Sequence, residues 1–296
     1  MAASPLDQNA VFVHDNAPPP PQLQGSLLAL FSLKGRTAIV TGGAAGIGLS
    51  VAQGLAEAGA NIALFYNTNE KALERAAEIE KKYGVKAKAY KCELRDYKKA
   101  EDTINEAVKD FNGRLDVFIA NAGIPWTQGP TVDGPIQHYL DVVQTDLDAT
   151  WYCARAAAAH WRRQKEEGTD LFGNKLENFT YGSFVATASM SGHIVNIPQL
   201  QAPYNAAKAG VRHLVKSLAV EWPKFARANT ISPGYIATEI SNFVPQETHN
   251  IWKSKIPLGR EGLPEELKGA FLYLASDASS YTTGTDIIVD GGYCAP

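Results

Sequence analysis

The stretch TAIVTGGAAGIGLSVAQGLAE, residues 37–57, decides the fold. A short β-branched run leads into a glycine-rich turn at 41–48, and an apolar pattern with helical spacing follows. Gly46 and Gly48 allow the backbone to approach a pyrophosphate closely, and the N-terminus of the following helix offers unpaired N–H groups and a favourable dipole. A strand, a glycine turn and a helix in this order predict a dinucleotide-binding unit, rather than a turn with only a structural role.

The same alternation continues to the end of the chain. Short apolar runs predict strands at 37–40, 61–65, 85–90, 115–120, 183–188, 226–231 and 286–289. Amphipathic stretches predict helices at 46–58, 69–83, 96–112, 135–165, 203–223 and 264–275. Alternating strands and helices predict an α/β fold, a single doubly wound domain over residues 31–296 with helices on both faces of a parallel sheet. A polar stretch between about 162 and the strand at 183 is expected to be a surface loop.

Residues 1–30 differ from the rest because they have no periodic pattern. They contain four consecutive prolines at 18–21, a composition that favours an extended chain. We therefore expect a mobile N-terminal arm. The apolar residues at 27–31 are suited to docking on the body of the domain.

Composition excludes several classes of protein. The 296 residues carry 28 basic and 31 acidic side chains, so the chain is not a polycation built for nucleic acid. No apolar run approaches the ~18 residues of a membrane span, and the start has no signal-peptide pattern, so we expect a cytoplasmic protein. The three cysteines lie far apart and the six histidines show no ligand spacing, which predicts no disulfide framework and no metal site.

Tyr204 and Lys208 stand four residues apart in QAPYNAAK. In a helix they share one face, and a nearby ammonium favours the phenolate of a tyrosine whose ordinary pKa is ~10. Such a pair alone is a weak signal, because Tyr-x-x-x-Lys arises often by chance on exposed helix faces. Its place among the other motifs gives it meaning.

The glycine turn has the form Thr-Gly-x-x-x-Gly-x-Gly. Four further motifs follow in the order of the expected strands: Asn121-Ala-Gly123, Ser189 ahead of Tyr204-x-x-x-Lys208, Ser232-Pro-Gly234 and Asp290-Gly-Gly292. Over residues 33 to about 293, this ordered set resembles the short-chain dehydrogenase/reductase family of the classical type. The resemblance implies a Rossmann-type domain with a seven-stranded parallel sheet of order 3-2-1-4-5-6-7.

The resemblance also implies hydride transfer with Tyr204 as general acid and base. Lys208 would lower the tyrosine pKa and bind the nicotinamide ribose, and a serine hydroxyl would hold the carbonyl oxygen. Ser189 and Ser191 lie fifteen and thirteen residues before Tyr204, and thirteen is common in the family. Aligning Ala-Ser-Met-Ser-Gly with the family's Ser-Ser-x-x-Gly nevertheless assigns Ser189 to this role, with Ser191 as a supporting or loop residue.

The fourth member of the family's catalytic set, usually an asparagine, corresponds to Asp146. A carboxylate there can pair with Lys208 or accept from a water molecule, but it cannot donate, and its charge raises the pKa values of the lysine and the tyrosine. We expect Asp146 either to favour reduction, which needs a protonated Tyr204, or to be structural.

The end of the second strand indicates which cofactor binds. The position eighteen residues beyond Gly48 and the two after it are neutral: Tyr66, Asn67 and Thr68. A carboxylate there would bind the 2′-hydroxyl of NAD, whereas neutral groups admit a 2′-phosphate, so we predict NADP(H). The arginine usual in NADP-preferring relatives is missing, since Ala45 and Asn67 occupy its two places. Lys71 or Arg75 is a candidate substitute, although both fit an exposed helix face.

The expected cofactor contacts lie at strand ends, with Glu93 beside the adenine and Asn121 and Gly123 beside the adenosine ribose. The full set is Gly42, Ala45, Gly46, Ile47, Gly48, Tyr66, Asn67, Thr68, Glu93, Leu94, Asn121, Ala122, Gly123, Tyr204, Lys208, Pro233, Gly234, Ile236 and Thr238. Outside the ordered series, Asn-Ala-Gly and Ser-Pro-Gly are also ordinary turn sequences.

Within the family, TASMSGHIVN at 187–196 and Pro-Gln-x-Gln-x-Pro-Tyr-Asn at 198–205 look most like the fungal sorbose reductase and NADP-dependent mannitol 2-dehydrogenase group. This implies interconversion of a ketose and its polyol, of sorbose, fructose or xylulose type. Polar residues after the serine suit a hydroxylated ligand: His193, Asn196 and Gln199. Trp126 and Tyr235 fit either ligand contact or packing at the rim, and 235–259 is the expected substrate lid.

Two other functions stay open. The substrate is alternatively a prochiral or secondary-metabolite ketone. A non-catalytic NADP-binding sensor is the third reading, although loss of Tyr204, Lys208 or the serine would be its signature and all are present. Relatives commonly form homotetramers through the helices at 135–165 and 203–223 and the last strand, so a tetramer or dimer is expected.

Overall fold

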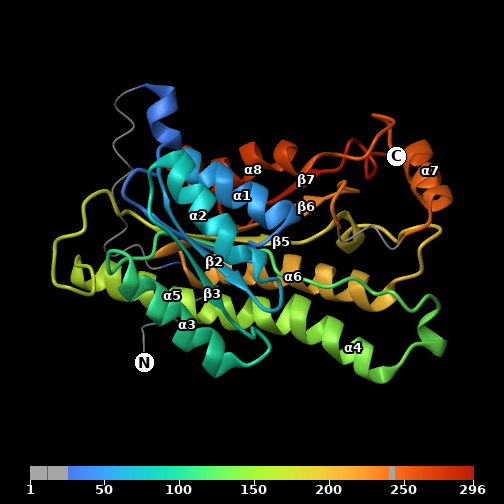
Figure 1. The fold of residues 1–296 in the computed structure, drawn as a ribbon, viewed down its shortest axis with the longest axis horizontal. Helices are drawn as coiled ribbons and strands as arrows, with labels where there is room; N and C mark the ends of the chain where they lie inside the picture. The colour runs from blue at the N-terminus through green and yellow to red at the C-terminus, as the bar shows by residue number, and fades with distance from the viewer. Residues whose placement is uncertain (1–11, 13–25, 240–243) are drawn as a thin grey trace.

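In the computed structural model, which describes residues 12, 26–239 and 244–296, the strands form one seven-stranded sheet of order β3-β2-β1-β4-β5-β6-β7 (Figure 1). Every neighbouring pair is parallel. The strands are β1 (Thr37–Thr41), β2 (Asn61–Tyr66), β3 (Ala87–Lys91), β4 (Val117–Ala120), β5 (Gly182–Thr187), β6 (Ala226–Pro233) and β7 (Asp286–Val289). The predicted α/β class and strand order are confirmed.

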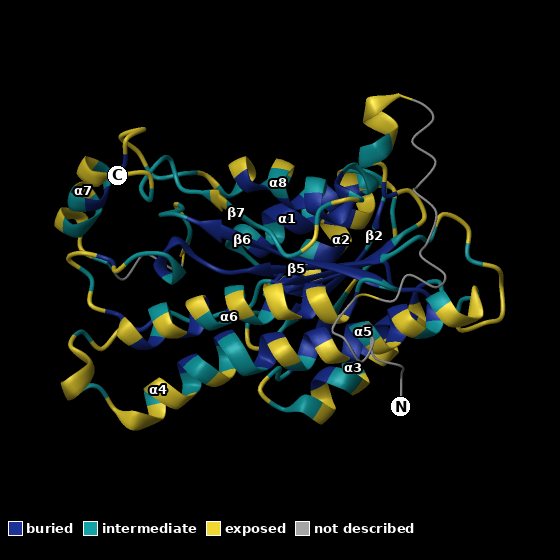
Figure 2. Cartoon of the chain, turned by 180° about the vertical axis from the view of Figure 1, so that it is seen from behind, coloured by how far each residue is buried: buried dark blue, intermediate teal, exposed yellow. Residues whose placement is uncertain are grey.

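Helices cover both faces of this sheet, so its central strands are buried throughout (Figure 2). One face carries α1 (Gly46–Glu57), α2 (Lys71–Tyr83) and α8 (Lys268–Ala275), and the other carries α3 (Tyr97–Asp110), α5 (Ala149–Glu167) and α6 (Ala202–Glu221). Because side chains alternate along a strand, successive residues point into the two different cores. In β1, Ile39 belongs to the core under α3, α5 and α6, whereas its neighbours Ala38 and Val40 belong to the core under α1 and α8.

The long helix predicted at 135–165 is not uniform. It consists of α4 (Ile136–Val143), a π-helical turn (Gln144–Asp148) and α5, which runs on to Glu167. In the π turn the Ala149 N–H donates to the Gln144 carbonyl, five residues back, which widens the helix locally. The predicted polar loop therefore begins later than expected, at Gly168, whose φ of 68° ends α5.

Other boundaries differ by smaller amounts. The strands β3 and β4 each begin two residues later than predicted, at Ala87 and Val117. In the N-terminal segment, a 3-10 helix, Leu27–Phe31, is capped by the Ser26 side chain. The rest of the expected arm, apart from residue 12, lies outside the described residues. None of the described helices is long and apolar enough to cross a membrane.

Candidate active site

A cavity of about 360 Å³ opens at the carboxyl ends of the central strands. Its wall includes the glycine turn after β1, the segment after β4, the residues that follow β5 and the segment after β6. The chain runs from β1 outward through β2 and β3 before returning to β4 beside β1. Ligands of doubly wound sheets bind where the strand order reverses in this way, which makes this cavity the candidate active site.

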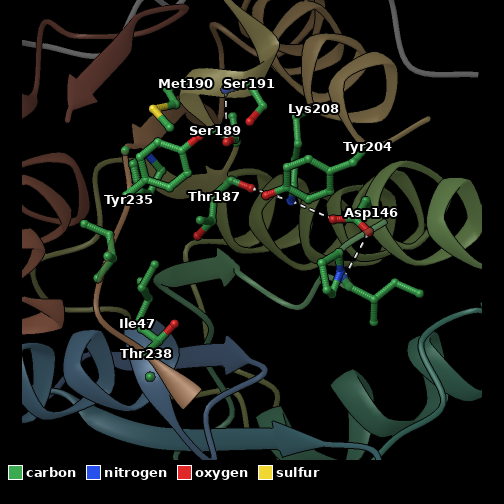
Figure 3. A pocket seen from close by; sticks show the side chains of 18 of the residues that line it. Ile47, Asp146, Thr187, Ser189, Met190, Ser191, Tyr204, Lys208, Tyr235 and Thr238 are labelled. Carbon is green, nitrogen blue, oxygen red and sulfur yellow. Dashed lines mark hydrogen bonds and ion pairs between the residues drawn. The ribbon is translucent and has the colours of Figure 1, made fainter. Parts of the chain in front are cut away.

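Tyr204 and Lys208 lie on one face of α6, as predicted, and both line this cavity (Figure 3). The Lys208 Nζ atom lies 5.5 Å from the centre of the Tyr204 ring. Nζ donates a hydrogen bond to the carbonyl oxygen of Thr187, at 3.1 Å, and forms an ion pair with Asp146 Oδ1, at 2.8 Å. The ammonium is therefore fixed beneath the phenol by two oxygens from other elements.

Asp146 comes from the π turn between α4 and α5, and its side chain is fully buried. Its second oxygen, Oδ2, accepts from the Ile124 N–H at 3.1 Å. A Cβ atom at Gly123 would lie 2.5 Å from Asp146 Oδ1 and 3.2 Å from Lys208 Nζ, so only glycine leaves room for the pair. The structure thus places Asp146 in the same buried cluster as Tyr204 and Lys208.

Burial and charge act on these groups in opposite directions. Burial raises the pKa of Tyr204; the Lys208 ammonium lowers it, and the Asp146 carboxylate raises it. For Lys208, burial opposes the charge, but Asp146 raises the pKa above its ordinary value overall. Burial also raises the pKa of the Asp146 carboxyl, against the influence of Lys208. The net direction keeps Lys208 charged and Tyr204 protonated near neutral pH.

The two serines have different partners. Ser189 hydrogen-bonds the Tyr204 phenol, and its Oγ accepts from the Ser191 N–H at 3.1 Å. Ser191 Oγ instead accepts from Gln201 Nε2 at 3.0 Å. Ser189 is therefore the hydroxyl beside the phenol, while Ser191 belongs to the next set of polar groups.

The glycine turn fits a pyrophosphate. Gly42 and Gly46 have φ values of 64° and 54°, which side chains rarely adopt. A Cβ atom at Gly48 would lie 2.3 Å from the Gly42 carbonyl oxygen, so the turn is closely packed. The N-cap residue Ala45 offers no side-chain cap, which leaves the first N–H groups of α1 for an anionic ligand.

A family model described as enoyl-(acyl carrier protein) reductase matches residues 42–294, which include the turn from Gly42 onward and every residue of the cavity. The chain belongs to the short-chain dehydrogenase/reductase family. Its predicted membership is therefore confirmed.

Known relatives cover nearly the whole chain. It is 60% identical over 289 residues to the L-xylulose reductase of Hypocrea jecorina (strain QM6a), covering 98% of this chain and 100% of that protein. It is 51% identical over 268 residues to the NADP-dependent mannitol dehydrogenase of Alternaria alternata, covering 90% and 94% of the two chains. The crystal structure of NADPH-dependent 3-quinuclidinone reductase from Rhodotorula rubra matches with a TM-score of 0.86 and 41% identity, covering 94% of this chain and 98% of that one.

Most of the predicted cofactor residues line the cavity. They are Gly42, Ala45, Gly46, Ile47, Asn121, Ala122, Gly123, Tyr204, Lys208, Pro233, Gly234, Ile236 and Thr238. Asn121 is held by β1 and β5, because its N–H donates to Thr41 Oγ1 at 2.9 Å and its Oδ1 accepts from Thr187 Oγ1 at 3.1 Å. This family motif thus fixes the junction between neighbouring strands.

The other predicted cofactor residues lie outside the cavity: Gly48, Tyr66, Asn67, Thr68, Glu93 and Leu94. Asn67 Nδ2 donates to Glu93 Oε2 at 3.2 Å, and Arg95 pairs with both Glu93 and Asp141. Of the candidate cations, Arg75 pairs with Glu78 at 2.8 Å. The structure therefore gathers Asn67 and Glu93 beyond the ends of β2 and β3, at the edge of the site.

His193, expected to suit a hydroxylated ligand, points elsewhere, and Trp126 follows the packing alternative of its prediction. His193 does not line the cavity; its Nε2 lies 2.5 Å from Asp286 Oδ2 and 3.3 Å from Ser232 Oγ. Trp126 is 1% exposed and its Nε1 donates to the Gly129 carbonyl, so it packs the segment after β4. Tyr235, by contrast, lines the cavity.

Thr187 and Gln201 are cavity residues to which no role was assigned from the sequence. Thr187 supplies the backbone oxygen that holds Lys208, and Gln201 is the N-cap residue of α6. Trp252, which belongs to the expected lid segment, also lines the cavity and stacks on Tyr235 with ring centres 4.1 Å apart. The position of Gln201 just before the helix with Tyr204 was the available signal. Thr187 acts through its backbone carbonyl, which every residue has, so its residue type gave no signal.

Proposed function

We propose that this protein is an NADPH-dependent carbonyl reductase that interconverts a ketose of sorbose, fructose or xylulose type and its polyol. The observation that carries the proposal is the Lys208 ammonium, held between Thr187 and Asp146 beneath the Tyr204 phenol. Ser189 hydrogen-bonds the same phenol inside the cavity that the glycine turn borders. The names of the relatives, L-xylulose reductase and mannitol dehydrogenase, support a ketose or polyol as the substrate.

Bound NADPH supplies a hydride to the carbonyl carbon. In the proposed reaction Ser189 donates a hydrogen bond to the carbonyl oxygen and fixes its position. Tyr204 then gives its phenolic proton to that oxygen as negative charge develops there. Lys208 stabilises the resulting phenolate, and Asp146 keeps Lys208 charged and in place. For polyol oxidation, Tyr204 as phenolate takes the proton back.

The glycine turn, Asn121 and Gly123 would hold the cofactor. The choice of NADP(H) is supported by the neutral residues Tyr66 and Asn67 at the end of β2 and by the relative named NADP-dependent. A kinetic comparison tests this choice. A kcat/KM with NADPH above that with NADH is expected, and equal or reversed values contradict the assignment.

A reductase of simple prochiral ketones is the second candidate, because one of the matching crystal structures is of a 3-quinuclidinone reductase. NADPH oxidation measured over a panel of ketoses and unhydroxylated ketones separates the two functions. Higher kcat/KM for a ketose supports the first, and higher values for plain ketones support the second. Tight NADPH binding without turnover of either class would favour the non-catalytic sensor.

The assembly and location of the protein are further parts of the proposal. Apolar side chains exposed on α4 and α5, including Ile136, Tyr139 and Trp151, support a homotetramer, as does Ile288 on the edge strand β7. Light scattering after size-exclusion chromatography tests it: a tetramer or dimer is expected, and a monomer at micromolar concentration contradicts it. We also propose a cytoplasmic protein. The predicted lid, 235–259, includes residues 240–243, which lie outside the described residues; its described part contains α7 (Gln246–Lys255), and we propose that this part covers the substrate.

A further inference from the structure

A cluster of buried amides lines the cavity next to the serines. Gln201 is 7% exposed, and its Nε2 faces three acceptors. These are Asn196 Oδ1 at 2.8 Å, Ser191 Oγ at 3.0 Å and Asn205 Oδ1 at 3.1 Å. An amide nitrogen carries two hydrogens, so this donor group is fully engaged within the protein.

The other polar atom of the Gln201 amide is its carbonyl oxygen, Oε1, and its surroundings differ from those of Nε2. Gln201 lines the cavity, and within the described part of the chain no group donates to its carbonyl oxygen Oε1. The three contacts of Nε2 fix which way the amide points. Oε1 is therefore the atom that Gln201 presents to a ligand, and it is an acceptor.

The hydrogen bonds of Ser191 indicate where Gln201 Oε1 lies relative to the reacting carbonyl. Its N–H donates to Ser189 Oγ at 3.1 Å, and its own Oγ accepts from Gln201 at 3.0 Å. One residue thus links Gln201 to the serine that holds the carbonyl oxygen in the proposed reaction. A group bound by Gln201 would lie close to the carbonyl carbon.

Packed side chains beyond Asn196 hold this cluster of amides in place. Asn196 is 1% exposed, and its Nδ2 donates to the Tyr235 hydroxyl at 3.1 Å. Tyr235 stacks on Trp252 with an interplanar angle of 11°. Figure 3 shows Tyr235 and Tyr204 on opposite sides of Ser189. The orientation of Gln201 is therefore set by packed groups and does not depend on a ligand.

We propose that Gln201 determines specificity by accepting a hydrogen bond from a hydroxyl on the carbon next to the reacting carbonyl. The site then selects α-hydroxy ketones, the chemical class to which ketoses belong. This inference rests on the proposed function for the reacting carbonyl, but it does not need a sugar as the natural substrate. A ketone without the hydroxyl would leave Oε1 without a donor, a loss worth about tenfold in kcat/KM.

Hydroxyacetone and butanone test this, because they differ only in a hydroxyl in place of a methyl group. The kcat/KM ratio for the two ketones, measured with NADPH, is compared between the unmodified enzyme and Gln201→Met. We expect the preference for hydroxyacetone to fall about tenfold in the variant. The change in the ratio is decisive, since the hydroxyl also activates the carbonyl chemically. Asn205→Ala is the matched control, as it removes another acceptor of Nε2 from a residue that does not line the cavity.

The possible outcomes separate the two proposals. A parallel loss with both ketones in Gln201→Met, at an unchanged ratio, assigns a structural role to Gln201 and overturns the inference. A ratio that falls equally in Asn205→Ala also overturns it. Turnover of hydroxyacetone but of no ketose contradicts the proposed ketose function, while the ratio still tests Gln201. Reduction of a ketose but of neither small ketone overturns the inference on Gln201 and leaves the ketose function standing. Turnover of neither small ketone and of no ketose overturns both.

Discussion

Replacing Asp146 by asparagine should move the pH profile of the enzyme to lower pH. Lys208 Nζ lies 2.8 Å from Asp146 Oδ1 and 5.5 Å from the centre of the Tyr204 ring. The carboxylate thus lies within about 8 Å of that ring, a separation at which two unit charges interact by about 2 kcal/mol at an effective dielectric constant of about 20. Because the Asp146 carboxylate raises the pKa of Tyr204, Asp146→Asn should lower that pKa.

The sign differs for the two directions of the reaction. Reduction needs protonated Tyr204, so its activity should begin to fall at a lower pH in the variant than in the unmodified enzyme. Oxidation needs the phenolate, so its activity should also begin to rise at a lower pH in the variant. Initial rates with saturating cofactor, measured from neutral to alkaline pH in both directions, give these limbs.

Asp148→Asn is the matched control, because Asp148 belongs to the same π turn and loses the same charge outside the cavity. Its limbs should stay in place. Unchanged limbs in Asp146→Asn would show that Asp146 is neutral or uncoupled from Tyr204. A shift to higher pH would contradict the reasoning outright.

Three further experiments with variants test other parts of the site. Ser189→Ala should lower kcat about 100-fold or more, because it removes the hydroxyl beside the phenol. Ser191→Ala should lower kcat less than about tenfold. Steady-state kinetics measure both values, and the reverse ranking would exchange the roles of the two serines. Gly48→Ala puts a Cβ atom 2.3 Å from a backbone oxygen and should weaken NADPH binding at least about tenfold in a fluorescence titration. Gly269→Ala on α8 is the control, because nothing lies within 4 Å of a Cβ atom there. Equal NADPH binding by the two variants would refute the close packing of the glycine turn. Lys208→Met leaves a buried carboxylate without its partner and should lower the free energy of unfolding by about 3–5 kcal/mol in urea, so unchanged stability would argue against the ion pair.

Much of the fold followed from local sequence. The glycine turn at 41–48 and the alternation of apolar and amphipathic stretches predicted the sheet and helices, because each element carries its own periodic signal. The π turn at 144–148 did not, since the residues that form it also suit an ordinary α-helix. The turn lies between α4 and α5 and places Asp146 against Lys208 in the candidate site.

The site was predictable where a motif fixes both residue type and direction. Tyr204 and Lys208 share a helix face, so their spacing determined their relation. His193 and Trp126 lie in irregular segments, where no periodicity tells which way a side chain points. Gln201 was overlooked for a different reason, because its importance depends on three acceptors brought together by tertiary structure.

The proposed ketose reduction through Tyr204 is tested most directly by NADPH oxidation and identification of the product. L-xylulose, D-fructose and L-sorbose are supplied to the unmodified enzyme and to Tyr204→Phe, which keeps the ring and loses the hydroxyl. At least one ketose should give its polyol, and kcat should fall about 100-fold or more in the variant while NADPH still binds. No polyol from any of the three sugars, or an undiminished rate in Tyr204→Phe, would contradict the account.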